Sequence, residues 1–176
     1  MAAKLSPIGV DKLTLRPVQA WNDWLLLAAG DFAAKKYNAM VVGWGSMGVM
    51  WGRPFVQVVV RPTRHTQGFM QRYDTFTVCA FPAACRPALN VLGTKSGRDG
   101  DKIAESGLTP VASRSVAAPS FKEADLVIEC RTIYAAQFDP KHFLADFIAG
   151  NYKNDYHWSY FGEIVAACGV AKYAGA

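Results

Sequence analysis

The residues best suited to chemistry form a short polar run directly after a β-branched segment. Phe55–Val60 is typical of a strand, and Arg61-Pro62-Thr63-Arg64-His65-Thr66 follows it. If a helix begins after Thr63, the N–H groups of its first turn point outward beside two hydroxyls and two guanidinium groups, which is a favourable seat for a phosphate. The competing interpretation is a threonine cap with two solvated arginines. Because five polar residues fall within six positions, we favour the anion site.

A second basic element, Ser96-Gly97-Arg98-Asp99-Gly100-Asp101-Lys102, lies further along the chain. Its flexible turn and terminal lysine would close over the same anion from another side. Charged glycine turns are more often solvated loops, so this element supports the anion site without establishing it.

A glycine-rich motif before the polar run matches a dinucleotide fingerprint only in its letters. Gly43-Trp44-Gly45-Ser46-Met47-Gly48 fits G-x-G-x-x-G, which requires a helix opening at the glycines and an acidic residue about 20 positions on. Gly52 and Pro54 would break such a helix, and Arg61–Gly68 contains no Asp or Glu. We therefore expect a glycine-rich strand and turn whose backbone closely approaches something flat or crowded.

Other catalytic constellations are missing from the sequence. It holds no Ser/His/Asp set, no metal-ligand spacing among its three histidines and no convincing carboxylate pair, so we predict no protein catalytic residue and no metal site. Glu129 and Glu163 lie in apolar strands, where an ion pair with Arg131 or another arginine is the expected role. The four cysteines form no C-x-x-C pair and are expected to be reduced, small hydrophobic residues.

Short β-type runs separated by Gly, Pro, Asn and Asp must position these residues. The expected strands are Trp24–Ala29, Ala39–Trp44, Phe55–Val60, Thr75–Phe81, Asp125–Gln137 and Phe161–Ala167. The expected helices are one capped by Thr63 and ending near Tyr73, Pro82–Leu92, Gly100–Ser106 capped by Asp99, and Pro140–Ile148. Strands that do not alternate with long helices predict a small antiparallel barrel with attached helices. We expect one domain over residues 1–176, with a surface loop at Gly107–Ser120.

Composition limits the class of protein and of partner. The chain has 176 residues, of which 51% are hydrophobic and 19% charged, enough apolar material to fold without disulfides or metals. Its formal charge of +5 fits an anionic partner, but the cations are scattered and no long basic run marks a nucleic-acid tail. Ala39–Gly52, the longest uncharged stretch, is too short to span a bilayer. Without a secretory signal, we expect a cytoplasmic protein that binds neither nucleic acid nor membrane.

Four segments occur in a fixed order along the chain: Asn38–Gly45, Trp51–Pro54, Val60–Thr66, and Leu92–Asp99 with Asp101-Lys102. Together they resemble the flavin reductase-like, FMN-binding split-barrel family, including its flavoredoxin-type members. The likeness spans most of the chain. It implies a mainly β fold, a six-stranded antiparallel split β-barrel of Greek-key type with a few short flanking helices. It also implies a homodimer that holds FMN near the subunit interface.

The resemblance further implies which residues hold the cofactor. In the family, the segment matching Asn38–Trp44 lies along the isoalloxazine ring and contacts it largely through backbone groups, while the segment matching Arg61–Thr66 binds the phosphate. The implied cofactor-binding residues are Asn38, Ala39, Met40, Val41, Trp44, Gly45, Ser46, Arg61, Thr63, Arg64, His65, Thr66 and Lys102. Two positions depart from the family pattern. Val41 stands where many members have Thr, which removes a hydroxyl contact to the ring, and Ile103 stands where an aromatic is common.

The implied function asks little of protein acids and bases, because a flavin carries the difficult step itself. We expect an FMN-dependent NAD(P)H oxidoreductase of the flavin reductase type, in which NADH or NADPH passes hydride to the flavin and on to an acceptor. The alternative is a non-catalytic flavin carrier or electron-transfer module. A nucleic-acid-binding barrel is disfavoured, because the aromatics lie mainly in apolar strands. His157 is the substrate-side candidate, although a surface or interface histidine among aromatics is its simpler interpretation.

Overall fold

Eight strands form one antiparallel sheet in the computed structural model, which describes residues 4–175. Along the sheet the order is β3 (Lys36–Val42), β2 (Leu25–Asp31), β6 (Thr75–Ala80), β9 (Leu126–Gln137), β10 (Trp158–Gly169), β5 (Arg53–Val60) and β4 (Gly45–Met50), with β1 (Ser6–Ile8) added to β10. A separate pair consists of β7 (Pro110–Val111) and β8 (Ser120–Phe121). The mainly β, antiparallel fold is confirmed. The six expected strands correspond to β2, β3, β5, β6, β9 and β10, and β1 and β4 extend the sheet.

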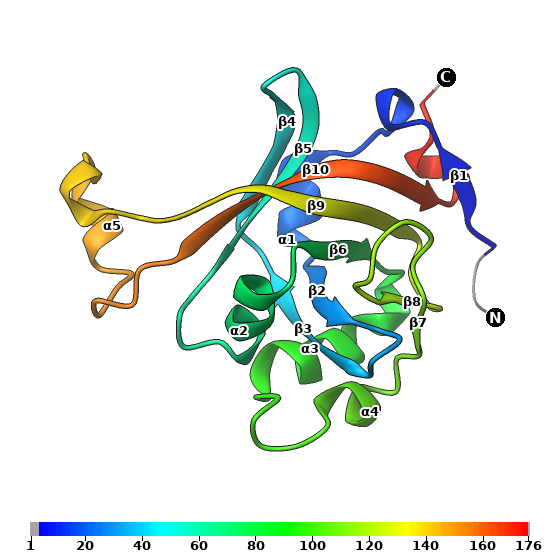
Figure 1. Cartoon of the computed structure of the whole chain (residues 1–176), viewed down its shortest axis with the longest axis horizontal. Coiled ribbons are helices and arrows are strands. Elements are labelled where there is room, and N and C mark those ends of the chain that lie inside the picture. The colour runs from blue at the N-terminus through cyan, green and yellow to red at the C-terminus, as the bar shows by residue number, and fades with distance from the viewer. Residues whose placement is uncertain (1–3, 176) are drawn as a thin grey trace.

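Short helices cover one side of this sheet. α2 (His65–Arg72) contacts β2 and β3, and α3 (Arg86–Thr94) contacts β3 and α4 (Lys102–Ser106). Figure 1 shows these three helices gathered beside β2 and β3. The remaining helices are α1 (Pro17–Asn22) and α5 (Asp146–Ala149), with 3₁₀ turns at Val10–Lys12, Ala83–Cys85, Pro140–His142 and Ala171–Tyr173.

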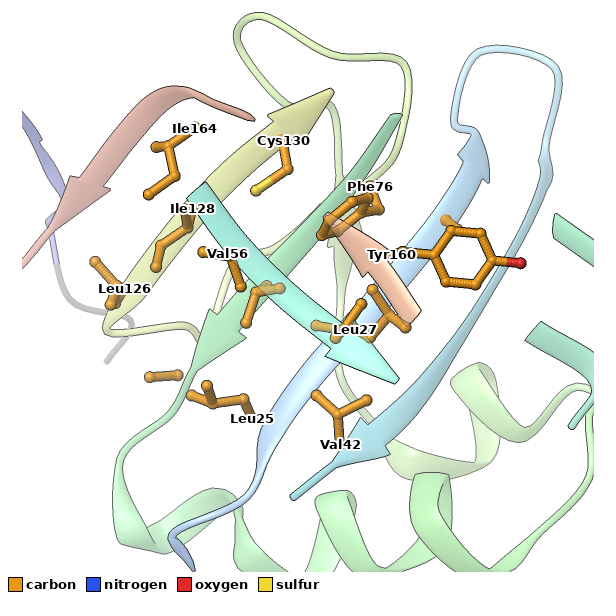
Figure 2. Close-up of a cluster of buried hydrophobic side chains, with 14 of the residues drawn as sticks. Leu25, Leu27, Val42, Val56, Phe76, Leu126, Ile128, Cys130, Tyr160 and Ile164 are labelled. Carbon is orange, nitrogen blue, oxygen red and sulfur yellow. The ribbon is translucent and has the colours of Figure 1, made fainter. Parts of the chain in front are cut away.

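Strand β2 is buried on both faces, which explains its uninterrupted apolar sequence. Leu25 and Leu27 belong to the barrel core, which Figure 2 shows enclosed between the strands. Leu26 and Ala28 point the opposite way and join a second core beneath α3 and α4. Each fully buried Leu or Val contributes roughly 1.5–3 kcal/mol, so this strand holds the helices to the barrel. The barrel core also contains Val56, Val58, Val60, Phe76, Ile128 and Tyr160.

All four helix predictions need correction. The helix expected at Pro82–Leu92 starts later, because a 3₁₀ turn at Ala83–Cys85 precedes α3, which begins at Arg86. α2 begins at His65 with Arg64 in the N-cap position, so Thr63 is not its cap. Asp101, not Asp99, caps α4, because its Oδ1 accepts from the N–H groups of Ile103 and Ala104 at 3.1 and 3.0 Å. The continuous helix expected at Pro140–Ile148 is wrong, since a 3₁₀ turn and the single-turn α5 replace it.

The α5 segment lacks the packing that a helix of this length needs. It lies at the end of a long extension of β9 and β10, away from the rest of the barrel (Figure 1). Leu144 is 96% exposed and Phe147 is 79% exposed. Because short helices depend on burying an apolar face, the segment does not form the regular helix that its sequence predicted.

The Gly107–Ser120 loop is tied to the barrel by a buried carboxylate. Glu129 accepts hydrogen bonds from the N–H groups of Arg114 at 2.9 Å and Ser115 at 2.6 Å. The expected ion pair is therefore wrong for Glu129. It is confirmed for Glu163, which lies 3.5 Å from Arg53.

Three other features bear on the predictions. All four cysteines are free, and burial raises the pKa of Cys79 to about 12. No helix within residues 4–175 is long and apolar enough to cross a bilayer. The glycine-rich motif forms β4 instead of opening a helix, so its rejection as a dinucleotide fingerprint is confirmed.

Candidate functional site

A groove of about 170 Å³ runs along the edge of the sheet at the end of β3. Its lining comes from Met40–Trp44, Val59, Arg61, Arg64 and His157. β3 is the last strand of the sheet, so no strand within residues 4–175 pairs with its outer side. Its main-chain N–H and C=O groups on that side are therefore free to bind a ligand.

The side chains of β3 are largely occupied by packing. Met40 and Val42 belong to the barrel core, whereas Ala39 and Val41 pack into the second core. This alternation leaves the groove with a main-chain edge as its polar wall. The arrangement suits a flat ligand that is held by backbone hydrogen bonds.

Trp44 and His157 form the outer wall of the groove. Trp44 is 50% exposed, and the centre of its ring lies 5.1 Å from that of His157. His157 is buried, and its Nδ1 lies 3.0 Å from the hydroxyl oxygen of Tyr152. Burial, with a smaller contribution from the Arg61 charge, lowers the pKa of His157 to about 4. This imidazole is therefore neutral at physiological pH.

Gly45 and Ser46 do not line the groove. A Cβ at Gly45 would overlap the carbonyl of Gln57 and the ring of Trp21, so this glycine permits close packing. The Ser46 hydroxyl donates to Gln57 Oε1 at 2.7 Å. The structure gives both residues roles in holding β4 against its neighbours.

A second cavity, of about 820 Å³, meets β3 at its other end. Asn38, His65, Gly97 and Lys102 contribute to its lining. Asn38 Nδ2 donates to Thr66 Oγ1 at 2.8 Å, and both side chains are buried. A Cβ at Gly97 would lie 2.6 Å from Asn38 Oδ1 and 2.8 Å from the His65 ring. Three segments far apart in the sequence therefore converge here.

Positive charge surrounds this end of the site. The pKa of His65 is lowered first by burial and then by the charges of Arg98 and Lys102. Lys102 is buried and donates to the carbonyls of Leu92 at 2.8 Å and Lys95 at 3.2 Å. Burial, and then the Arg64 charge, lowers its pKa to about 8.

Arg64 and Arg98 complete the positive end. Arg64 Nη1 lies 3.4 Å from the Gly93 carbonyl. Arg98 Nη1 donates to the carbonyl of Thr63 at 2.9 Å. The sequence analysis identified Ser96–Lys102, which contains Arg98, as a basic turn. Of its residues, only Lys102 was predicted to bind the cofactor. Thr63 itself is exposed and contributes a carbonyl to this contact.

Arg61 is engaged elsewhere. Its Nη1 donates to Asp155 Oδ2 and its Nη2 to the Asn151 carbonyl, both at 2.7 Å. Its guanidinium also lies 5.2 Å from the centre of the Tyr152 ring. Two of the five N–H donors of Arg61 are therefore already used by the segment Asn151–Asp155, and its binding to a phosphate stays a prediction.

Comparison with solved structures identifies the fold. Similar chains include a flavoredoxin from Methanosarcina acetivorans, with a TM-score of 0.67 and 22% identity, which covers 94% of this chain and 73% of that one. An FMN-binding domain of a flavin reductase-like enzyme from Shewanella baltica OS155 has a TM-score of 0.66 and 15% identity, covering 96% and 78%. A protein with a split barrel domain from Shewanella frigidimarina NCIMB 400 has a TM-score of 0.65 and 17% identity, covering 90% and 75%. The split-barrel expectation is thereby confirmed.

Sequence comparison identifies the family. A curated relative, an uncharacterised protein from Pyrococcus abyssi, is 31% identical over 120 residues, which is 67% of this chain and 67% of the relative. The family model described as "Flavin reductase like domain" matches residues 25–169, from the start of β2 to the end of β10. This chain belongs to the flavin reductase-like domain family.

Proposed function

We propose that this protein binds FMN and acts as an NAD(P)H-dependent oxidoreductase of the flavin reductase type. The observation that carries the proposal is the free main-chain edge of β3, which joins a flat groove to a positively charged cavity. A flavin mononucleotide has the matching shape, with a planar ring at one end and a phosphate at the other. Family membership and the flavin-binding neighbours support the same cofactor.

The residues present fit this group. Met40–Trp44 would lie along the ring and bind it through main-chain groups, which agrees with a valine at position 41. Thr66 Oγ1 accepts from Asn38, so its own hydroxyl hydrogen is left to donate to a phosphate oxygen. Gly97 lets the basic turn pack directly against Asn38 and His65 at this end. Arg64, His65 and Lys102 would supply donors or positive charge, and we add Arg98 to them.

The protein contributes binding and orientation to the reaction. Bound FMN would supply a ring that accepts hydride and releases electrons. The β3 edge would fix the plane of that ring, and the positive end would hold the phosphate and so set its position along the groove. Trp44 and His157 would cover part of the exposed face and limit the access of water.

The electron donor is proposed as NADH or NADPH, stacked on the open side of the groove. Among the structural neighbours is an NADH:FAD oxidoreductase from Streptomyces globisporus, which supports this choice. Flavoredoxins among the neighbours support the second candidate, an electron-transfer module without its own nicotinamide site. Both candidates place the flavin in the same groove.

We also propose that the protein is a cytoplasmic homodimer. Trp51 is 64% exposed and Tyr134 is 48% exposed, with ring centres 6.0 Å apart. An exposed aromatic pair of this kind favours burial against another protein surface. Sedimentation analysis should give a dimer, and Trp51→Glu should shift it toward the monomer. The free cysteines are consistent with a reducing compartment.

The visible absorption spectrum of the purified protein tests the cofactor first. A flavin spectrum, or one that develops on adding FMN and survives gel filtration, is the expected result. Anaerobic bleaching by NADH or NADPH then tests the donor. A bound flavin that neither nucleotide reduces, but that dithionite does, would favour the electron-transfer module. A protein that takes up no FMN would contradict both candidates.

A further inference from the structure

Arg61 holds the segment Asn151–Asp155 against the end of β5. Its two hydrogen bonds, to Asp155 Oδ2 and the Asn151 carbonyl, are both 2.7 Å long. The side chains of Arg61 and Asp155 are only 29% and 22% exposed. By contrast, the Arg53–Glu163 pair at the start of the same strand is 3.5 Å long, and its arginine is 67% exposed. The contact at Arg61 is therefore shorter and less exposed than the Arg53–Glu163 surface ion pair. We call the contacts of Arg61 with Asn151 and Asp155 the clamp.

Tyr152 connects Arg61 to His157, because it contacts both residues. The guanidinium lies over the Tyr152 ring, and the hydroxyl of Tyr152 lies 3.0 Å from His157 Nδ1. The Tyr152 ring also stacks on Phe143, with ring centres 5.8 Å apart, so its position is fixed from a second side. Arg61, Tyr152 and His157 thus form a chain of contacts from the strand to the groove.

The chain of contacts determines which nitrogen of His157 is available. The Tyr152 hydroxyl is assigned as the donor to Nδ1, because no other acceptor for its hydrogen is found within residues 4–175. A neutral imidazole that accepts at Nδ1 carries its hydrogen on Nε2. Within residues 4–175, Nε2 has no hydrogen-bond partner, and His157 lines the groove. A hydrogen-bond donor is therefore left for a ligand.

The surroundings indicate what that ligand is. Beside the main-chain edge of β3, the groove is lined by the partly exposed Val41, and Trp44 gives it an aromatic wall. The charge of Arg61 is offset by Asp155, and His157 is neutral. Arg64 also lines the groove, but in the FMN-loaded protein the proposed phosphate would balance its charge. An uncharged flat molecule with one hydrogen-bond acceptor suits these groups better than an anion does.

We propose that Arg61 is a positioning residue which, through Asp155 and Tyr152, presents His157 Nε2–H to a carbonyl oxygen on a flat, uncharged ligand in the groove. The inference rests on the proposed flavin site, because the ligand would lie against the exposed ring face. The same chemistry belongs to the carboxamide of a nicotinamide nucleotide and to an aromatic aldehyde acceptor, and the experiment separates the two.

Binding to the FMN-loaded protein tests the donor. Benzamide and benzaldehyde are the carbonyl probes, ethylbenzene is the carbonyl-free probe and benzoate is the anion, each titrated by its effect on the flavin spectrum. His157→Phe should weaken one or both carbonyl probes roughly 3- to 10-fold, the usual effect of losing one hydrogen bond. Ethylbenzene should be unaffected, and benzoate should bind more weakly than either carbonyl probe. If His157→Phe weakens benzamide binding and raises the KM for NADH, the ligand is the nicotinamide. If it weakens only benzaldehyde binding, the ligand is the acceptor. Unchanged affinity for both carbonyl probes overturns the proposal.

Two matched pairs of variants test the clamp. Tyr152→Phe should lower the affinity for the carbonyl probe, whereas Tyr156→Phe, in the same aromatic cluster, should not. Arg61→Ala should also lower the affinity for the carbonyl probe, and it should leave the ratio of FMN to riboflavin affinity unchanged. Arg53→Ala is its control and should change neither quantity. If Arg61→Ala instead weakens FMN selectively and spares the probes, Arg61 is a phosphate ligand and the proposal is wrong.

A measurement on the flavin-free protein keeps the clamp testable if FMN does not bind. Lys153 lies within the clamped segment, and its N–H donates to Asp155. Trypsin should therefore cleave after Lys153 several-fold faster in Arg61→Ala than in wild type or Arg53→Ala. Equal cleavage rates would show that Arg61 does not hold the segment, whatever the flavin does.

Discussion

Gly97→Ala is the sharpest test of the phosphate end of the site. Gly97 does not have a left-handed φ, so alanine meets no backbone strain there. Its new Cβ would lie 2.6 Å from Asn38 Oδ1 and 2.8 Å from the His65 ring, closer than van der Waals contact allows. Either the turn withdraws or Asn38 moves, and the hydrogen bond that orients Thr66 then weakens.

The expected loss follows from the size of the overlap. Overpacking by one methyl group costs about 1–3 kcal/mol of folding stability. If the site relaxes away from its binding geometry, restoring that geometry costs at most the same free energy, which sets an upper limit of roughly 5- to 150-fold on the loss of affinity. Because the clash lies at the phosphate end, FMN should lose most of this affinity and riboflavin little. Quenching of flavin fluorescence gives both dissociation constants.

Gly68→Ala is the matched control. Gly68 lies in α2, and a Cβ there would meet no atom within 4 Å. It should leave both affinities unchanged and stabilise the helix by about 0.5–1 kcal/mol. If Gly97→Ala folds with an unchanged melting temperature and binds FMN as tightly as wild type, the phosphate end has been assigned wrongly. Equal losses for FMN and riboflavin would likewise contradict the assignment.

Three further predictions follow from buried groups. The pKa of Lys102 is about 8, so FMN affinity should fall as the pH rises from 7 to 9 and the ammonium loses its proton, while riboflavin affinity stays constant in the same titration. Glu129→Gln should lower the free energy of unfolding by roughly 1.5–3 kcal/mol in urea, because the N–H groups of Arg114 and Ser115 lose a charged acceptor; unchanged stability would mean the loop is held by other contacts. The pKa of His157 is lowered to about 4, below its unfolded value, so its neutral form stabilises the fold fully above pH 6.5 and this contribution falls toward pH 4. His157→Phe should therefore flatten that part of the thermal-stability profile.

The barrel strands were predictable because burial on two faces marks them strongly. Trp24–Ala29 and Phe55–Val60 fall within one or two residues of β2 and β5. β4 was expected only as a glycine-rich strand and turn without definite bounds, since its Gly45-Ser46-Met47-Gly48 sequence has weak strand propensity. It forms a strand because β5 pairs with it, from Gly45 opposite Val58 to Met50 opposite Arg53. Tertiary pairing therefore decided what local sequence left open.

Some residues of the site were likewise predictable from local sequence, and others were not. Met40–Trp44 and Thr66 carry local signals, a glycine-rich strand end and a polar run, and the structure brings them to the two ends of β3. Asp155, the partner of Arg61, carried no local signal in the sequence. It lies 94 residues from Arg61, in a segment that contacts β5 only in the folded chain. The cap of α4 was predicted two residues too early. Asp99 and Asp101 are two residues apart, and only the geometry of the turn selects the second.

The three cations expected at the phosphate each have a protein acceptor. Arg61 binds Asp155 and the Asn151 carbonyl, Arg64 approaches the Gly93 carbonyl and Lys102 binds two carbonyls at the end of α3. Within residues 4–175, Arg61 is the one of the three that is paired with a negative charge. Arg64 and Lys102 therefore keep their positive potential, although Lys102 uses two of its three donors. Their contribution to anion binding is then mainly long-range and should weaken as salt is added. In the proposed site the hydroxyl of Thr66 would donate directly to the phosphate, so the loss of FMN affinity in Thr66→Ala should persist at high salt, whereas the loss in Arg64→Ala should shrink.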